Sequence, residues 1–162
     1  MAGDFSKAPP LEVDRWFNAD VAPTLEAWRG KVVVIEAFQM LCPGCVSHGL
    51  PQAQRIRATF SDDEVVVIGL HTVFEHHTAM TPVALEAFLH EYRIDFPVAV
   101  DRAGIDGPIP QTMRAYGMQG TPTLCLIDAE GLLRHQYFGR VEDLVIGAQI
   151  ASLLFEARLA SA

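Results

Sequence analysis

Two stretches rich in β-branched residues, 31–38 (KVVVIEAF) and 64–70 (EVVVIGL), place the strongest constraint on the fold. Each is almost continuously apolar instead of alternating between apolar and polar residues, a pattern typical of strands buried on both faces. Such strands need helices on either side of their sheet. The sequence therefore predicts an α/β fold in which a central sheet lies between helical layers.

The rest of the chain is expected to supply those helices and to complete the sheet. Thr81 and Pro82 suit the N-cap and the first position of a helix, and 129–131 separates two apolar runs as a hairpin turn would. The other predicted elements are an extended segment at 11–17, a helical turn at 23–28, helices at 46–60, 82–92, 110–116 and 140–160, a strand at 96–100, and hairpin strands at 123–128 and 133–138. We expect one domain over residues 1–162, a three-layer sandwich with a mixed central sheet, an N-terminal extension and an inserted helix at 82–92.

Charge and hydropathy exclude several classes of protein. The 162 residues include 20 acidic and 12 basic side chains, for a net charge of −8, which argues against a nucleic acid or an anionic membrane as partner. No apolar run reaches the roughly 18 residues of a membrane span, and the first ten residues lack the apolar core of a signal peptide. We therefore expect a cytoplasmic protein, with a trimmed secreted form left open.

Three cysteines are too few for a disulfide scaffold, but two of them form Cys42-Pro43-Gly44-Cys45, the spacing of a redox or metal pair. The motif stands where the strand at 31–38 gives way to the helix at 46–60. Because a helix N-terminus stabilises a thiolate, Cys42 is the predicted nucleophile in disulfide exchange. Cys45, one turn further on, would resolve the mixed disulfide. The cysteines themselves would hold the electrons, so no cofactor is expected.

In its motifs and order of elements the chain resembles the thioredoxin superfamily, in particular its TlpA-like and ResA-like thiol-disulfide oxidoreductases (redoxin domains). The resemblance extends from about residue 11 to the last helix. It rests on three features: Gly30-Lys31 with the strand and cysteine motif that follow, Gly120-Thr121-Pro122-Thr123, and Leu126-Ile127-Asp128-Ala129-Glu130-Gly131.

The resemblance implies roles for five residues. Cys42 would be the nucleophile and Cys45 the resolving thiol, and together they would form the redox-active disulfide. Pro122 would be a cis-proline beside them, with Thr121 offering backbone hydrogen bonds to the substrate. Glu36 would be a buried acid that accepts the proton of Cys45, since a carboxylate in an apolar strand has a raised pKa; alternatively, it reaches solvent at the strand end. The implied activity is reduction of disulfides in proteins or small molecules, with electrons from a donor that is not identified.

Two other functions compete with this interpretation. Phe38 and Cys42-Pro43 resemble the active site of a peroxiredoxin-type thiol peroxidase, although the activating threonine would fall at Gln39 and the conserved arginine at Pro122. Cys42, Cys45 and His48 suit a metal-binding or copper-delivery module, but a closed zinc site needs a fourth ligand. The copper proteins also carry a histidine where this chain has Thr121-Pro122. Disulfide exchange is therefore the preferred hypothesis.

Several residues near the motif have simpler expected roles. His71, His76 and His77 follow the strand at 64–70 and could face the active site, but histidines in a polar loop more often contact only water, which is the expectation here. Cys125 stands between two leucines and is expected to be a small buried core residue. Leu41 occupies the position before the first cysteine, where thioredoxins place an aromatic residue.

Overall fold

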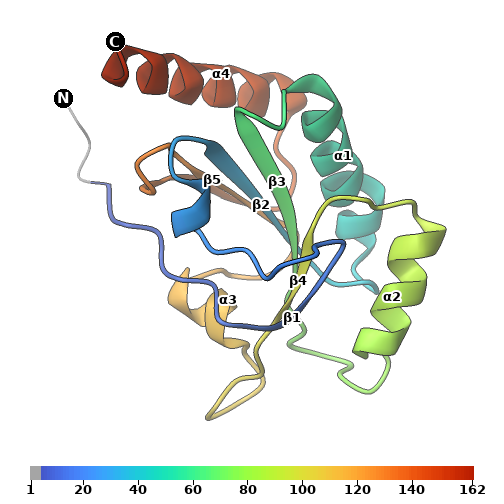
Figure 1. Ribbon diagram of the computed structural model, residues 1–162. Helices are drawn as coiled ribbons and strands as arrows, with labels where there is room; N and C mark the ends of the chain where they lie inside the picture. Colours follow the sequence, from blue (N-terminus) through green and yellow to red (C-terminus); the bar gives the residue numbers. More distant parts are fainter. Residues whose placement is uncertain (1–4) are drawn as a thin grey trace.

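The computed structural model describes residues 5–162, and a mixed sheet of six strands forms its centre (Figure 1). The strands are β1 (Val13–Phe17), β2 (Val32–Phe38), β3 (Val65–His71), β4 (Val98–Asp101), β5 (Thr123–Ile127) and β6 (Leu133–Phe138). Their order across the sheet is β1-β4-β3-β2-β5-β6. Residues 1–4 lie outside the described residues. They belong to the first ten residues, which were compared with a signal peptide, and to the domain expected over 1–162.

Helices cover both faces of this sheet, as predicted (Figure 1). Three of them, α1 (Leu50–Thr59), α2 (Pro82–Glu91) and α4 (Asp143–Ala160), pack through buried side chains on one face. The short helix α3 (Gln111–Ala115), the 3-10 turn η1 (Glu26–Trp28) and the segment just before β1, through Ala8 and Leu11, pack on the other face. The thioredoxin-like three-layer sandwich is confirmed, including the inserted helix α2, whose N-cap Thr81 accepts a hydrogen bond from the Ala84 N–H.

The register of the sheet decides where the ends of strands meet. Strand β2 is parallel to β3 and antiparallel to β5, and all seven of its residues are buried. Phe38, its last residue, pairs with His71 at the end of β3, while Ala37 pairs with Thr123 at the start of β5. The segment after β2, the segment after β3 and the segment before β5 therefore meet at one edge of the sheet.

The helix predicted at 46–60 has a different beginning. It starts at Pro43, and a π-helical turn η2 (Cys45–Gly49) precedes α1, with the Leu50 N–H donating to the carbonyl of Cys45. Pro51 explains the wider turn, because its ring would clash with the carbonyl of residue 47 in a regular α-helix and it has no N–H to donate. The added turn carries Cys45 and Gly49 into the core, where both are buried.

The last helix also differs in part from the expectation. It begins at Asp143 instead of at residue 140, because Glu142 has extended backbone and forms its N-cap. Among its apolar residues, Ile150 and Leu154 are buried, whereas Leu144 and Leu159 are exposed. No helix within residues 5–162 is long and apolar enough to cross a membrane.

The hairpin between β5 and β6 forms as predicted, and Asp128 closes it. One oxygen of this carboxylate, Oδ1, accepts the N–H of Glu130 at 3.0 Å and that of Leu132 at 2.9 Å. Gly131 has a φ of +84°, and a side chain there would overlap the guanidinium of Arg29. The Asp-x-x-Gly part of the sequence motif is thus explained by turn geometry.

Candidate active site

The predicted thiol pair lies at the edge of the sheet where these three segments meet. Cys42 and Cys45 are joined by a disulfide, with their Cα atoms 5.2 Å apart. Cys42 is half-buried, whereas Cys45 has no exposed surface. The Cys45 N–H points at the Sγ of Cys42, 3.2 Å away. In the reduced protein this N–H and the helix dipole would stabilise a Cys42 thiolate. The geometry therefore supports the prediction that Cys42 is the nucleophile and Cys45 the resolving thiol.

Thr121 and Pro122 face the cysteines across the site. The peptide bond between them is cis. The carbonyl oxygen of Thr121 lies 3.5 Å from the Sγ of Cys42, and a Cβ built on Gly44 would lie 3.3 Å from the Cδ of Pro122. No hydrogen bond within residues 5–162 uses the Thr121 N–H. The main chain of Thr121 is therefore free to pair with another extended chain next to Cys42.

Glu36 is buried under the site, with only 1% of its surface exposed. Its Oε1 has no hydrogen-bond partner among the described residues, and burial raises the pKa of this carboxyl well above its usual range. The alternative that Glu36 reaches solvent at the strand end is wrong, because helix α1 and the turn before it cover that part of β2.

Gly49 makes room for the Glu36 carboxyl. A side chain at Gly49 would overlap Oε1 of Glu36, and its Cβ would lie 3.0 Å from the Cβ of Pro122. The π turn that carries Gly49 also carries Cys45. Glu36 and Pro122 thus lie close to the turn that carries Cys45.

The histidines have different environments. His76 and His77 are exposed, as predicted, and Nε2 of His48 lies 3.0 Å from the carbonyl of Val141. The expected contact of His71 with water is wrong: His71 is the last residue of β3, is 1% exposed, and packs against the Phe38 ring at 5.1 Å between centroids. Its Nε2 accepts the N–H of Met40 at 3.4 Å, so it contacts the segment that leads to Cys42.

Burial of His71 makes the free energy of unfolding depend on pH. Burial lowers the pKa of His71 to about 4, so the folded protein keeps the ring neutral while the unfolded chain binds a proton near pH 6.5. The stability contributed by His71 is complete above pH 6.5 and is lost as the pH falls toward 4, by about 3 kcal/mol over that window. We expect urea titrations to show this loss as the difference between wild type and His71→Gln, whose side-chain oxygen can accept the same N–H. His77→Gln should behave as wild type; an identical pH profile for His71→Gln would contradict the assignment.

Gln39 is the site residue that sequence reasoning missed, having been noted only where a peroxiredoxin places a threonine. It is 1% exposed, and its side chain contacts both Thr121 and the main chain of Phe74. A polar residue directly after a buried strand and three positions before Cys42 was the signal available in the sequence. Cys125 is buried as predicted, and burial raises the pKa of its thiol.

The metal alternative gains no support from the side-chain arrangement. In the part of the chain that the structure describes, no group of three His, Cys, Asp or Glu side chains is placed to hold an ion. The imidazole of His48, the suggested third ligand, instead contacts Val141 in the connection between β6 and α4.

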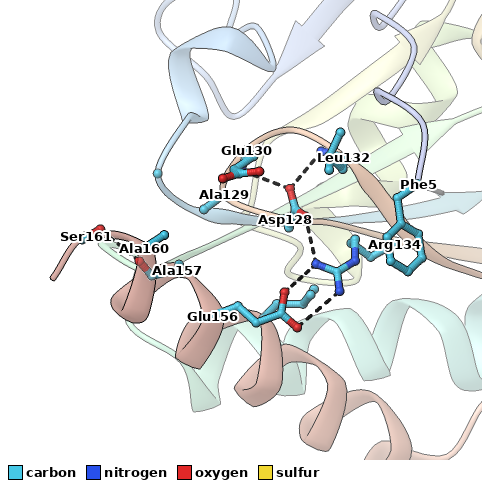
Figure 2. A pocket seen from close by; sticks show the side chains of 12 residues that line it. Phe5, Asp128, Ala129, Glu130, Leu132, Arg134, Glu156, Ala157, Ala160 and Ser161 are labelled. Carbon is cyan, nitrogen blue, oxygen red and sulfur yellow. Dashed lines mark hydrogen bonds and ion pairs between the residues drawn. The ribbon is translucent and has the colours of Figure 1, made fainter. Parts of the chain in front are cut away.

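A pocket of about 820 Å³ lies at the other end of β5 from the thiol pair (Figure 2). Figure 2 shows the Arg134 guanidinium between two carboxylates, 3.0 Å from Asp128 and 2.6 Å from Glu156. The Phe5 ring covers the same guanidinium at 4.3 Å. The charges that line the pocket are therefore largely paired with one another, and no cysteine is among the lining residues.

A cysteine pair at the start of a helix, opposite an X-Pro loop and above a buried acid, defines a thioredoxin-like thiol-disulfide oxidoreductase. Residues 6–136 match the AhpC/TSA family model, and the chain belongs to this family. Among solved structures it is similar to a thioredoxin-like superfamily protein, with 63% identity, a TM-score of 0.90, and coverage of 91% of this chain and 96% of the other. A thiol-disulfide isomerase from Corynebacterium glutamicum is 51% identical, with a TM-score of 0.86 and the same coverage.

Curated relatives are more distant. The thiol-disulfide oxidoreductase ResA from Bacillus cereus is 26% identical over 136 residues, which cover 80% of this chain and 71% of ResA. The protein DipZ from Mycobacterium tuberculosis is 28% identical over 154 residues. That match covers 93% of this chain but only 21% of DipZ, so the chain spans about a fifth of this relative.

Proposed function

We propose that this protein reduces disulfide bonds in protein substrates through the Cys42–Cys45 pair. One observation carries the proposal: the Sγ of Cys42 lies at a helix N-terminus, 3.5 Å from the main chain of Thr121, whose N–H is free among the described residues. The same place therefore offers a stabilised nucleophile and a main-chain edge for an extended substrate. The relatives named for thiol-disulfide oxidoreduction or isomerisation support the reaction class.

The reaction would proceed in two exchanges. The Cys42 thiolate attacks one sulfur of the substrate disulfide, forms a mixed disulfide and releases the other substrate sulfur as a thiolate that takes up a proton. Cys45, once deprotonated, attacks the Sγ of Cys42, which closes the Cys42–Cys45 disulfide and releases the second substrate thiol. The substrate gains two electrons and two protons, and a separate dithiol donor must reduce the pair again.

Glu36 would manage the proton of the second exchange. Because burial keeps this carboxyl protonated at higher pH than an exposed glutamate, its pKa lies closer to that of a thiol. A base of that kind can accept the Cys45 proton as the sulfur attacks. The close approach of the Glu36 carboxyl to Gly49, which lies in the same π turn as Cys45, supports this role.

The direction of the reaction depends on the compartment. We propose a cytoplasmic location, where reducing conditions would keep the pair mainly as a dithiol and favour the reductase direction.

Exposed Leu41, which is 59% accessible beside Cys42, would give an apolar contact for the substrate at the rim of the site.

Direct transfer from the reduced protein tests the proposal against the peroxidase alternative. Protein reduced with dithiothreitol and freed of reductant is mixed either with a disulfide-linked peptide that carries a fluorophore and a quencher, or with hydrogen peroxide. We expect one peptide disulfide to be reduced per protein molecule, and only slow oxidation by peroxide, because the Gln39 amide is engaged with Thr121 and Phe74. Rapid peroxide consumption with an inert peptide would overturn the proposal.

A further inference from the structure

Gln39 contacts all three segments that form the site. Its carbonyl accepts the N–H of Cys42 at 3.2 Å. Its side-chain Nε2 donates to Oγ1 of Thr121 at 3.5 Å, and its Oε1 accepts the N–H of Phe74 at 3.2 Å. These partners are 82 and 35 residues away in the sequence. One side chain therefore bridges the segment before β5 and the segment after β3, from a position next to the nucleophile.

Burial makes these two side-chain contacts difficult to replace. Gln39 is 1% exposed, so water cannot readily take over a lost partner. Without the amide, the Phe74 N–H and the Thr121 hydroxyl would lose an acceptor and a donor in a partly buried place, and the segments would shift to find others. The position of Thr121 depends most on the Gln39 amide, and the carbonyl of Thr121 faces the Sγ of Cys42.

We propose that Gln39 is a positioning residue that holds the Thr121 main chain in register with Cys42, and so presents a polypeptide disulfide to the nucleophile. The inference rests on the proposed function, because it concerns how a peptide substrate pairs with Thr121. Gln39 acts through Thr121 and not on the reacting sulfurs. A disulfide without a peptide backbone gains nothing from this pairing.

Two substrates separate this role from a general effect on the thiols. With the disulfide-linked peptide, Gln39→Ala should lower kcat/KM about tenfold, the effect of losing one hydrogen bond that orients the substrate, mainly through KM. With the small aromatic disulfide 5,5′-dithiobis(2-nitrobenzoate), and for alkylation of Cys42 by iodoacetamide, the same variant should match wild type. A loss of equal size with both disulfides would overturn the proposal, because it would place the effect on Cys42 itself.

Gln52→Ala is the matched control. Gln52 is also a buried glutamine with two side-chain hydrogen bonds, to the Val141 carbonyl at 2.8 Å and to Asp143 at 2.9 Å, but neither partner lies at the thiol pair. Its removal should lower the melting temperature in the way that Gln39→Ala does, while kcat/KM for the peptide stays unchanged. A tenfold loss in Gln52→Ala would show that any destabilised variant fails with peptides, and would also overturn the proposal.

Variants at Thr121 keep the test valid if Gln39→Ala does not fold. Thr121→Val removes the hydroxyl that Gln39 holds and should lose peptide activity to a similar degree, whereas Thr121→Ser keeps the hydroxyl and should retain it. The double variant Gln39→Ala/Thr121→Val should be no worse than Gln39→Ala alone, because that variant has already lost the contact that Thr121→Val removes. Multiplied losses, or full activity of Thr121→Val, would contradict the inference. Wild type that fails to reduce the peptide would instead contradict the proposed function.

Discussion

Replacing Cys45 with serine is expected to convert the protein from a catalyst into a trap for its substrates. In this variant Cys42 still lies at the helix N-terminus, with the residue 45 N–H directed at its sulfur, so the first exchange proceeds. No thiol remains at the site to attack the mixed disulfide, because Cys125 is buried in the sheet, and turnover should fall by about 1,000-fold or more. Non-reducing electrophoresis and mass spectrometry should show covalent adducts joined through Cys42.

Cys42→Ser should behave in the opposite way, with neither turnover nor adducts. The remaining Cys45 has no exposed surface and cannot reach a substrate disulfide. Cys125→Ser is the control for loss of a thiol as such, and it should keep wild-type turnover because Cys125 is buried in the sheet. Equal trapping by Cys42→Ser and Cys45→Ser would refute the assignment of nucleophile and resolving thiol.

Glu36→Gln is expected to separate stability from catalysis. Burial raises the pKa of Glu36 in the folded protein. The favourable contribution of Glu36 to the free energy of unfolding is therefore complete below about pH 4.5 and is lost as the pH rises through the folded-state pKa. The glutamine variant has no such loss, so its stability relative to wild type should grow above pH 4.5 by up to about 1.4 kcal/mol per pH unit. Denaturant titrations at several pH values would measure this difference.

The same substitution should slow the second exchange, on the order of 100-fold, because the base that accepts the Cys45 proton is lost. Rapid-quench measurements should then show mixed disulfide accumulating in the variant, with a flatter dependence on pH than in wild type. Glu86→Gln, at an exposed position on α2, serves as control and should change neither stability nor rate. Unaltered kinetics in Glu36→Gln would leave the carboxyl without a part in the reaction.

The strands could be predicted well because the two central ones are buried on both faces and carry no polar alternation. Their boundaries in the structure, Val32–Phe38 and Val65–His71, differ from the predicted ones by a single residue at each shifted end. The π turn at Cys45–Gly49 could not be predicted in this way, since hydrogen bonding between residues five apart has no periodic sequence pattern. The exposed leucines of α4 were not foreseen, because apolar residues alone do not show which face of a helix meets the core.

The site residues likewise fall into two groups, those that local sequence patterns reveal and those that they do not. Cys42, Cys45 and Pro122 were found from local motifs, and the raised pKa of Glu36 follows from its place in an apolar strand. The contacts of Gln39 and His71 depend on neighbours that are distant in sequence, and only the register of the sheet brings these together. Polar residues at the ends of buried strands therefore merit inspection in related chains.

Labelling of the buried Cys125 thiol can measure how often the centre of the sheet opens. Its Sγ lies 3.4 Å from Oε1 of Gln136 within the sheet, and burial suppresses the thiolate that a labelling reagent needs. Of the three thiols in a reduced native sample, Cys42 should therefore react quickly, whereas Cys125 should react only when β5 separates from its neighbours. At low reagent concentration the slow phase reports the fraction of molecules in which the centre of the sheet is open, without any attached probe.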